Sequence, residues 1–508
     1  MNFNSKKLIS IFVTTMILVL IIIMKFVYGG LYSVSYENSL FWMKTLSITG
    51  WITLFWSILS WKSLRKEVIS LYILYLILTY FFTFGQSLLI LFDLVSENRD
   101  LLNRITSSQL INAQFFTLLC LVSFHLGALM ICKKPNHINN YIKNNTIQTK
   151  NNQFNLNIMQ VAIKRVGIIL LILSLPGFLY DTLNTLNTVV SEGYRALYGY
   201  DSGIVRASLI TRIFEYTSSY FLPALICLLI AYRNNAMLRR LIFTLMVIKI
   251  FNGLYIGGRG GATILLLVVI LIYHYSVRPI NKRGATLLTV TAYFFLSFLA
   301  IIAKLRGLSN RSPQDYFLAF IESFGKENLF FDTLSEIGWT MFPLSAVMAI
   351  IPDSFEYFYG KSYLYALTSI VPNLGFWDIH PAKVYAGGGQ WLMDTLDLYS
   401  GPGFTLIADA YRNFGWLGFF ALIGFGALFG RIYSSVDKLT IYKRPDILCF
   451  VMIFANATLM SVRGDNLYIV RPLFYEVLPI YILIRLTYIR MVNSRVEYSD
   501  TKKECRES

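Results

Sequence analysis

Long apolar runs dominate this sequence, each about 20 residues in length and separated by short basic segments. A helix of that length crosses the roughly 30 Å hydrocarbon core of a bilayer. Inside a bilayer every backbone polar group needs an internal partner, so only helices or closed barrels can span it. The runs are continuously apolar and do not alternate with polar residues, which indicates helices. We therefore expect an all-α, polytopic membrane protein.

The basic residues between the runs predict how the spans are oriented. Short cytoplasmic loops are enriched in Lys and Arg. A topology of twelve spans places every strongly basic short loop on the same side as Lys6 and Lys7, so both termini are expected in the cytoplasm. The predicted spans are 8–27, 41–61, 68–94, 110–132, 161–180, 213–232, 241–256, 262–277, 285–303, 414–433, 445–461 and 467–489.

This topology divides the chain into four parts. Residues 1–303 hold spans one to nine with short loops, 304–413 form a large extracytoplasmic loop, 414–489 hold spans ten to twelve, and 490–508 form a cytoplasmic tail. Two stretches of the large loop, around 316–324 and 342–351, are amphipathic or apolar and are expected along the membrane surface.

Composition excludes several classes of function. The net charge of +17 indicates topology and not nucleic-acid binding, because the basic residues lie mainly in short loops between apolar runs. The five cysteines form no C-x-x-C pair, so neither a disulfide framework nor a zinc site is expected. No P-loop or H-E-x-x-H motif is present, and we predict no metal and no cofactor.

Several arginines are predicted at the outer ends of spans. A guanidinium near membrane depth is costly unless it faces a cavity or a partner, and its planar fork matches phosphate oxygens. Such groups suit a pyrophosphate at the membrane surface; snorkelling, or pairing with Asp409 or Asp465, is the alternative. Arg259 is the best candidate, since four surrounding glycines imply exposed amide donors beside a helix start. The set is Arg195, Arg206, Arg259, Arg306, Arg311, Arg412, Arg463 and Arg471.

His380 is the one histidine predicted on the outer side. An imidazole titrates near neutral pH and can accept a proton from a sugar hydroxyl, and the nearby Trp377 and Trp391 suit stacking on sugars. A surface histidine of no special role is the alternative. The rival bases are Asp378, Asp394, Asp397 and Asp409. The tripeptide Arg463-Gly464-Asp465 matches an adhesion motif over three residues only, which is weak support for any function.

Two short stretches resemble a known family. A glycine–arginine–glycine turn at Arg259 and the stretch Asp409-Ala410-Tyr411-Arg412-Asn413-Phe414-Gly415, which leads from the large outer loop into the next span, look like the Wzy-type O-antigen polymerases. The arginine–ten residues–glycine motif of some members is not found at the arginines singled out above.

The resemblance implies a GT-C-like, metal-independent glycosyltransferase at the outer face of a bacterial inner membrane. It would move a growing glycan from undecaprenyl pyrophosphate onto a fresh lipid-linked repeat unit, in a lipid bilayer and with a chain-length regulator protein as a further partner. The pyrophosphate would be held by Arg259, Arg306, Arg412, Arg463 and Arg195, the base would be His380 or Asp409, and the sugars would stack on Trp377 and Trp391.

Two alternatives stay open at this point. An O-antigen ligase uses similar chemistry with a lipid A-core acceptor, and a deletion strain would then accumulate long unligated chains. A transporter or flippase of the lipid-linked oligosaccharide would place polar groups at mid-membrane on broken helices. The predicted spans are mostly free of ionisable residues there, which favours chemistry at the surface.

Overall fold

The computed structural model describes residues 2–30, 36–67, 69–135, 149–194, 197, 209–305, 312–323, 328–373, 376–398, 402–437 and 439–507. Within these ranges the chain forms helices and no strand. Eleven helical stretches are long and apolar enough to cross a membrane. The expected all-α, polytopic class is therefore confirmed.

The helices of the first half run as follows: α1 (Phe3–Gly30), α2 (Tyr36–Arg65), α3 (Leu71–Ile90), α4 (Ser107–Ile131), α6 (Thr149–Glu192), α7 (Leu209–Ser218), α8 (Phe221–Ala231), α9 (Ala236–Ile256), α10 (Arg259–Ile272) and η5 (Tyr273–Val277). Those of the second half are α11 (Lys282–Leu305), α12 (Pro313–Ser323), α13 (Leu329–Gly338), η6 (Trp339–Met341), α14 (Phe342–Ile350), α15 (Lys361–Thr368), α16 (Pro381–Tyr385), α17 (Gly388–Thr395), α18 (Leu406–Phe414), η7 (Gly415–Gly418), α19 (Phe419–Tyr433), α20 (Thr440–Lys443), α21 (Pro445–Thr458), η8 (Leu459–Arg463), α22 (Leu467–Pro472), η9 (Leu473–Val477) and α23 (Leu478–Glu507). Short 3-10 helices lie at Glu97–Arg99 and Leu101–Asn103.

The eleven candidate spans differ from the twelve predicted ones at three places. Two predicted spans lie in α2 and α9, which are helices but are less apolar: α2 is rich in Trp, Ser and Thr, and α9 carries basic residues. The set adds Leu329–Ile350, inside the segment expected outside the membrane. Asp332 and Glu336 dilute the apolar character of its first half, so the sequence pattern singled out only 342–351, as a stretch along the membrane surface and not as part of a span.

Tertiary packing shows why Leu329–Ile350 is helical and close to the bundle. α13 lies against α3, where Gly338 and Gly85 bring the two backbones into contact. The side-chain amide of Gln86 donates to the Ser335 carbonyl oxygen at 2.8 Å and accepts from the Leu101 amide at 3.1 Å. A buried polar side chain thus joins two helices and a loop.

The predicted span 161–180 was expected to lead into a loop that begins at Asp181. The first part of that prediction is wrong, because α6 continues to Glu192. Leu183, Leu186 and Val189 recur at helical spacing, and Val189 is buried, so this stretch keeps an apolar face for packing. The rest of that predicted loop, 195–208 apart from Leu197, lies outside the described residues.

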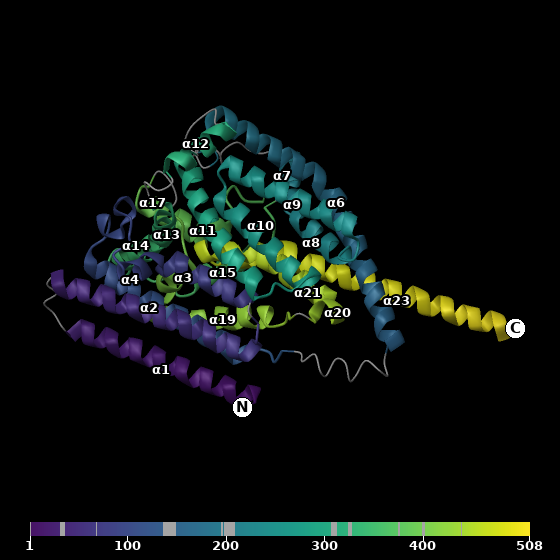
Figure 1. Cartoon of the computed structure of the whole chain (residues 1–508), viewed down its shortest axis with the longest axis horizontal. Coiled ribbons are helices and arrows are strands. Elements are labelled where there is room, and N and C mark those ends of the chain that lie inside the picture. Colours follow the sequence, from purple (N-terminus) through teal and green to yellow (C-terminus); the bar gives the residue numbers. More distant parts are fainter. Residues whose placement is uncertain are drawn as a thin grey trace.

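Two groups of helices make up the bundle, with α1–α4 and α19 on one side and α6–α10 on the other (Figure 1). The contact between α4 and α19 is the most intimate. A Cβ atom on Gly127 would overlap the backbone of Ile423, and one on Gly426 would overlap the backbone of Phe124. Small residues allow this approach, as in other membrane helix pairs.

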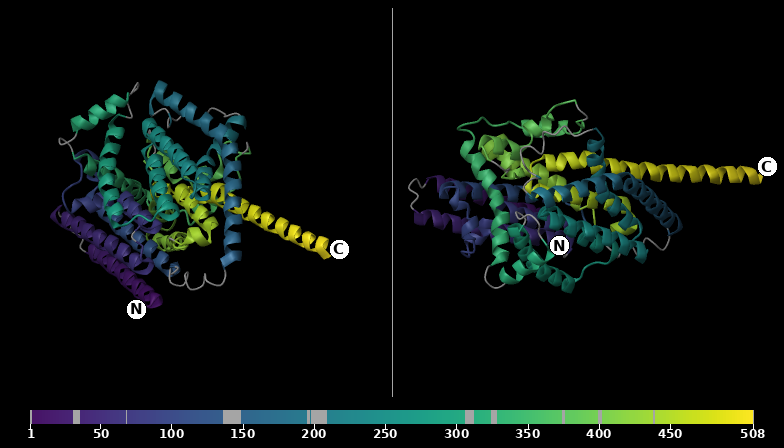
Figure 2. Two further views of the ribbon diagram at one scale, coloured as in Figure 1. Left: turned by 45° about the vertical axis from the view of Figure 1, so that its right-hand side comes forward. Right: turned by 90° about the horizontal axis from the view of Figure 1, so that it is seen from above.

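One end of the bundle gathers segments that were predicted to share a side. Arg65 donates to the carbonyl oxygens of Lys133 at 2.9 Å and Val436 at 2.7 Å. Lys7 donates to Cys132 at 3.3 Å, and the Lys133 amide donates to Ser434 at 3.1 Å. The N- and C-terminal ends point to this same side (Figures 1 and 2). Which side is cytoplasmic stays a prediction.

Candidate functional site

The stretch from Asp409 to Gly415 folds locally for reasons visible in its sequence. The Thr405 hydroxyl caps α18 by accepting from the Ala408 amide at 3.0 Å. Asp409 and Arg412 are three residues apart on the helix and therefore face one another. Gly415 ends the helix with a φ of +56°, a backbone conformation that favours glycine.

Asp409 and Arg412 form an ion pair with no exposed surface. The Arg412 Nη2 atom lies 2.7 Å from Asp409 Oδ1, and both side chains are 0% exposed. The Ser362 hydroxyl donates to the same carboxylate at 3.0 Å, and the Asn413 amide donates to Ser362 at 2.7 Å. Loss of one partner of a buried charge pair strongly destabilises a protein, and the Ser362 hydroxyl ties this pair in α18 to α15.

Three aromatic rings surround the Arg412 guanidinium. Its central carbon lies 4.5 Å from the ring centre of Phe358, 5.4 Å from that of Trp391 and 5.3 Å from that of Phe404. Its Nε and Nη1 atoms have no hydrogen-bond partner in the described part of the chain. Orphaned donors of this kind are unusual in a native interior and mark a site for a function or a water.

Asp465 joins this cluster from a distant part of the chain. One carboxyl oxygen accepts from the Gly388 amide at 2.8 Å, and the other accepts from the Leu467 amide at 3.1 Å. Burial, and next the neighbouring Asp409 carboxylate, raise the pKa of Asp465 from 3.8 to about 6. A carboxyl group with such a pKa is partly protonated near neutral pH, which suits acid–base chemistry.

Arg463, two residues before Asp465, is exposed at the end of η8. Its side chain runs along Gly403, where an added Cβ would lie 3.1 Å from the Arg463 Nε atom and where φ is +80°. Only glycine fits that position without strain. The glycine clusters of the outer segment thus let Arg463 and Asp465 lie close to the backbone.

Arg259 is partnered by a carboxylate. Its guanidinium forms a two-pronged pair with Glu336 of α13, at 2.6 and 3.2 Å, and also donates to the Leu299 carbonyl oxygen at 3.2 Å. Gly257, with a φ of +99°, ends α9 two residues before Arg259. Gly260 contacts Met460 of η8, so the start of α10 lies beside the helix that ends at Arg463.

His380 acts as a helix cap in this structure. Its Nδ1 atom accepts from the Ala382 amide at 3.0 Å, so Nε2 carries the hydrogen that reaches the Val371 carbonyl oxygen at 2.9 Å. With both ring nitrogens engaged, the imidazole has no free lone pair for a substrate proton. The exposed Trp377 packs edge-on against it at 4.9 Å.

The structure therefore brings together some predicted site residues and not others. Asp409, Arg412 and Trp391 meet around Asp465, with Arg463 at the exposed edge. His380 and Trp377 lie on a neighbouring loop that leads through α16 to Ala386 and Gly388. Arg195, Arg206, Arg306 and Arg311 lie outside the described residues.

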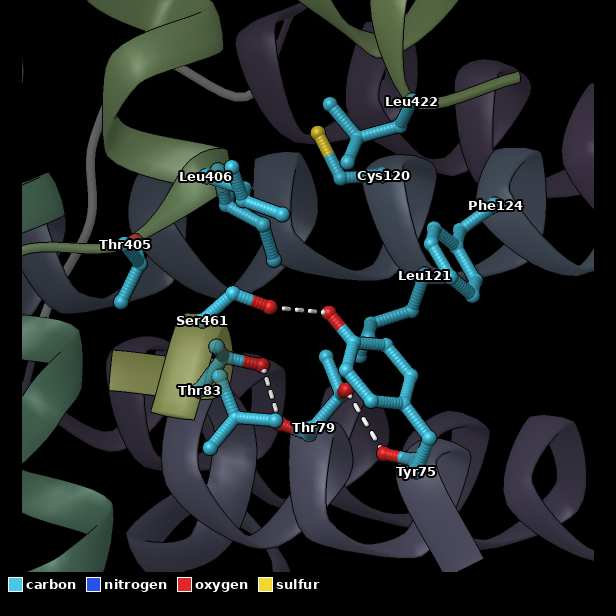
Figure 3. A pocket seen from close by; sticks show the side chains of 12 residues that line it. Tyr75, Thr79, Thr83, Cys120, Leu121, Phe124, Thr405, Leu406, Leu422 and Ser461 are labelled. Carbon is cyan, nitrogen blue, oxygen red and sulfur yellow. Dashed lines mark hydrogen bonds between the residues drawn. The ribbon is translucent and has the colours of Figure 1, made fainter. Parts of the chain in front are cut away.

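A small cavity lies behind this cluster, between α3, α4, α18 and η8 (Figure 3). Its volume is about 20 Å³, which has room for about one water molecule and none for a sugar. The Tyr75 and Ser461 hydroxyls, 2.9 Å apart, face one another across it.

Comparison with known proteins decides the family. The sequence model of O-antigen polysaccharide polymerase Wzy matches residues 9–495, nearly the whole chain. The chain belongs to the O-antigen polysaccharide polymerase Wzy family. No curated protein and no solved structure matches it.

Membership of the Wzy family confirms the resemblance drawn from Arg259 and from the stretch Asp409–Gly415. It supports polymerisation of O-antigen repeat units by a multi-pass membrane protein, and nothing favours the ligase or the transporter. In this Wzy-family polymerase, sequence reasoning gave Asp465 only as a pairing partner for an outer arginine and did not include it among the candidate bases. The only sequence feature that pointed to Asp465 was its place two residues after Arg463, in the tripeptide Arg463-Gly464-Asp465.

Proposed function

We propose that this Wzy-family polymerase transfers the growing glycan from undecaprenyl pyrophosphate onto a lipid-linked repeat unit beside the exposed Arg463 and the buried Asp465. The observation that carries the proposal is the Asp465 carboxyl group, whose pKa is raised to about 6, two residues from an exposed arginine. A base close to an exposed cation supplies the two groups that this transfer needs.

Asp465 takes the proton in the proposed step. The acceptor hydroxyl loses its proton to the carboxylate as its oxygen bonds to C1 of the donor sugar. The C1–O bond to the pyrophosphate breaks at the same time, and that oxygen leaves with the bonding electrons. The negative charge moves to the pyrophosphate, so the rate depends on groups that stabilise this charge.

The leaving pyrophosphate is assigned first to Arg463, which is exposed, and second to Arg259, which would exchange Glu336 for a phosphate oxygen. Arg412 is fully buried and holds Asp409, so its part in the proposal is to position the cluster. Arg195 and Arg306 stay candidates from the sequence. Guanidinium groups supply the positive charge, and the proposed reaction uses no metal.

Sugar contacts in the proposal come from Trp377, whose ring is 36% exposed. Trp391 already packs on Arg412 and Phe358, and therefore supports the cluster. His380, as the cap of α16, positions the loop that supplies the Gly388 amide to Asp465. The proposal places this reaction at the outer face of a bacterial inner membrane, with a chain-length regulator as partner.

A reconstituted assay with purified protein and undecaprenyl-pyrophosphate-linked repeat units tests the base. We expect Asp465→Asn to slow polymerisation by about 10² to 10⁴-fold, and the wild-type rate to rise with pH through about 6 as this carboxyl deprotonates. Asp437→Asn is the matched control, because Asp437 is also buried and accepts from an amide two residues later, the Leu439 amide at 2.9 Å. Asp437 lies at the end of the bundle opposite to Asp465, so Asp437→Asn should leave the polymerisation rate unchanged.

Two further arms of this assay separate the roles. Arg463→Gln should slow polymerisation while Asp465 still titrates, and polymerisation should continue in excess EDTA. Polymerisation by Asp465→Asn at the wild-type rate at pH 7.5 would show that Asp465 is not the base. Loss of activity in EDTA that Mg²⁺ restores would overturn the metal-free assignment.

A further inference from the structure

A second pocket opens between α1, α4, α14 and the α18–η7 junction. Its volume is about 250 Å³, twelve times that of the cavity behind Asp465 and close to the lower range of small-ligand sites. Its walls are a cation, two amides, two aromatic rings and a thioether. The lining residues are Lys25, Gln109, Asn112, Met348, Tyr411 and Trp416.

Lys25 is the unusual member of this lining. Its ammonium donates to the Asn112 side-chain oxygen at 2.6 Å and lies 4.9 Å from the ring centres of both Tyr28 and Trp416. A third ring, Phe115, is 5.6 Å away. No carboxylate lies within ion-pair distance of this ammonium among the residues that the structure describes.

A half-buried lysine on a membrane helix needs a reason. Placing a cation near membrane depth is costly unless it is paired or faces a cavity. The aromatic rings and one amide oxygen offset part of that cost, but they leave two of the three ammonium hydrogens without an acceptor among the residues that the structure describes. These hydrogens can be satisfied by an anionic group in the pocket.

The other wall residues fit a sugar. Rings such as Trp416 and Tyr411 offer flat apolar faces to a pyranose, and the amides of Gln109 and Asn112 can both donate to and accept from hydroxyl groups. Amides with aromatic faces and a single cation match a sugar that carries one negative charge.

The pocket lies next to the proposed reaction site. Tyr411 lines it and directly precedes Arg412 in α18. Successive residues of a helix point about 100° apart, so the pocket and the Asp409–Arg412 pair occupy different sides of the same helix. A glycan that reaches Arg463 and Asp465 would have a further sugar within about one helix diameter, ~10 Å, of them.

We infer that this pocket is a glycan subsite for a sugar residue bearing a carboxylate, with Lys25 pairing its charge and Trp416 packing on its ring. The inference rests on the proposed function for its setting. It goes beyond that function by naming the chemistry of a sugar that the polymerase selects. Acidic repeat units would then be preferred over neutral ones of the same size.

Binding of monosaccharides to the purified protein in phosphatidylcholine nanodiscs tests this inference. Saturation-transfer NMR would compare glucuronate with glucose. We expect glucuronate to bind about tenfold more tightly, which corresponds to one charge-assisted contact. Lys25→Met should abolish the preference and Lys25→Arg should retain it. Lys44→Met is the control, because Lys44 is a partly exposed lysine on the neighbouring helix α2 that pairs with Asp93 at 3.0 Å.

A second variant keeps the test valid if Lys25→Met disturbs the packing of α1. Met348→Trp fills the pocket and leaves the contacts of Lys25 in place, so it should block glucuronate binding. Asp465→Asn should bind glucuronate normally, which separates this inference from the proposed base.

Three outcomes would overturn the subsite. Glucose could bind as tightly as glucuronate, or the preference could survive in Lys25→Met. In discs that contain phosphatidylglycerol, the lipid could occupy the pocket through Lys25 while glucuronate shows no preference in phosphatidylcholine; the anionic ligand would then be a lipid phosphate and not a sugar.

Discussion

At the scale of single residues, Asp409 and Arg412 form the buried ion pair around which this stretch packs. Each is fully buried, and each satisfies the charge of the other at 2.7 Å. The Ser362 hydroxyl and the Asn413 amide also donate to the carboxylate oxygen that accepts from Arg412. The pair is thus part of the architecture around the site as well as of its chemistry.

Removing one partner of this pair should therefore unfold the site. We expect Arg412→Met to lower the free energy of unfolding by about 3–5 kcal/mol, because it removes the positive charge that pairs with the buried Asp409 carboxylate. The double variant Asp409→Asn with Arg412→Met should be less destabilised than the sum of the single variants. Thermal unfolding in detergent measures all three, and strictly additive effects would show that the pair is not coupled.

Asp465 links stability to pH in the opposite direction from an ordinary paired carboxylate. Its pKa is raised in the folded protein, from 3.8 to about 6, so the folded state binds this proton more tightly than the unfolded state. The resulting stability is fully present below pH 4 and is lost as pH rises through 6. The whole effect corresponds to about 3 kcal/mol.

This linkage predicts a difference between two melting curves. From pH 5 to pH 8, the wild-type protein should lose about 1 kcal/mol more stability than Asp465→Asn, because the variant lacks the titrating group. Comparison of the two proteins cancels the groups that they share. Parallel losses in both proteins would mean that Asp465 does not titrate in this range.

At the scale of helices, the contact between α4 and α19 depends on glycine. Gly426 has no room for a side chain against the backbone of Phe124, whereas Gly424, two residues earlier on the same helix, has nothing within 4 Å of an added Cβ. Substitutions at these two positions therefore distinguish the effect of close helix packing from the general effect of replacing a glycine in a helix.

Gly426→Leu should destabilise the bundle by about 1–3 kcal/mol or more, because α19 must move away from α4. Gly424→Leu should be neutral or slightly stabilising, since leucine has the higher helix propensity. Thermal unfolding and the membrane level of each variant measure this, and equal behaviour of both variants would argue against the close contact.

The pair between α10 and α13 separates a structural from a catalytic role for Arg259. Arg259→Glu and Glu336→Arg should each lower the melting temperature, since each places like charges together at a partly buried site. The double variant Arg259→Glu with Glu336→Arg should restore the melting temperature but not polymerisation, because the guanidinium group is then attached to α13 instead of α10.

Full polymerisation by the swapped protein would show that Arg259 serves only to pair with Glu336. Glu336→Gln is a useful companion, because it frees the guanidinium without moving it. It should keep polymerisation if Arg259 binds the pyrophosphate.

At the scale of the whole molecule, the ends of α2, α4 and α19 meet near the N-terminus. Arg65, Lys133 and Val436 lie at this end. Leu102, before the start of α4, lies at the other end and is exposed. These contacts bring to one end of the bundle three segments that were predicted to share a side.

Cysteine labelling tests the orientation of these ends. In a background without native cysteines, Leu102→Cys should react with an impermeant maleimide in intact spheroplasts. Lys66→Cys, at the end of α2, should react only after the membrane is opened. The reverse pattern would invert the topology and place the proposed site on the cytoplasmic side.

How much of this could be predicted differs from residue to residue. The stretch Asp409–Gly415 was recognised as important, and its helix, ion pair and terminating glycine follow from local spacing. Leu329–Ile350 was not predicted as a span, because Asp332 and Glu336 interrupt its apolar character and only the part from 342 was expected along the membrane surface. Its helices together are long and apolar enough to be a candidate span. The roles of Arg259 and His380 depended on partners that no local pattern names.

The sequence by itself determined the all-α membrane class and the family, because span length, apolar continuity and short motifs are local properties of a chain. Only the tertiary structure decided which charges meet. The Asp465 carboxyl receives the Gly388 amide from 77 residues away, and Arg65 reaches Val436 across 371. Such contacts depend on how helices pack, and the raised pKa of Asp465 depends on the burial that this packing creates.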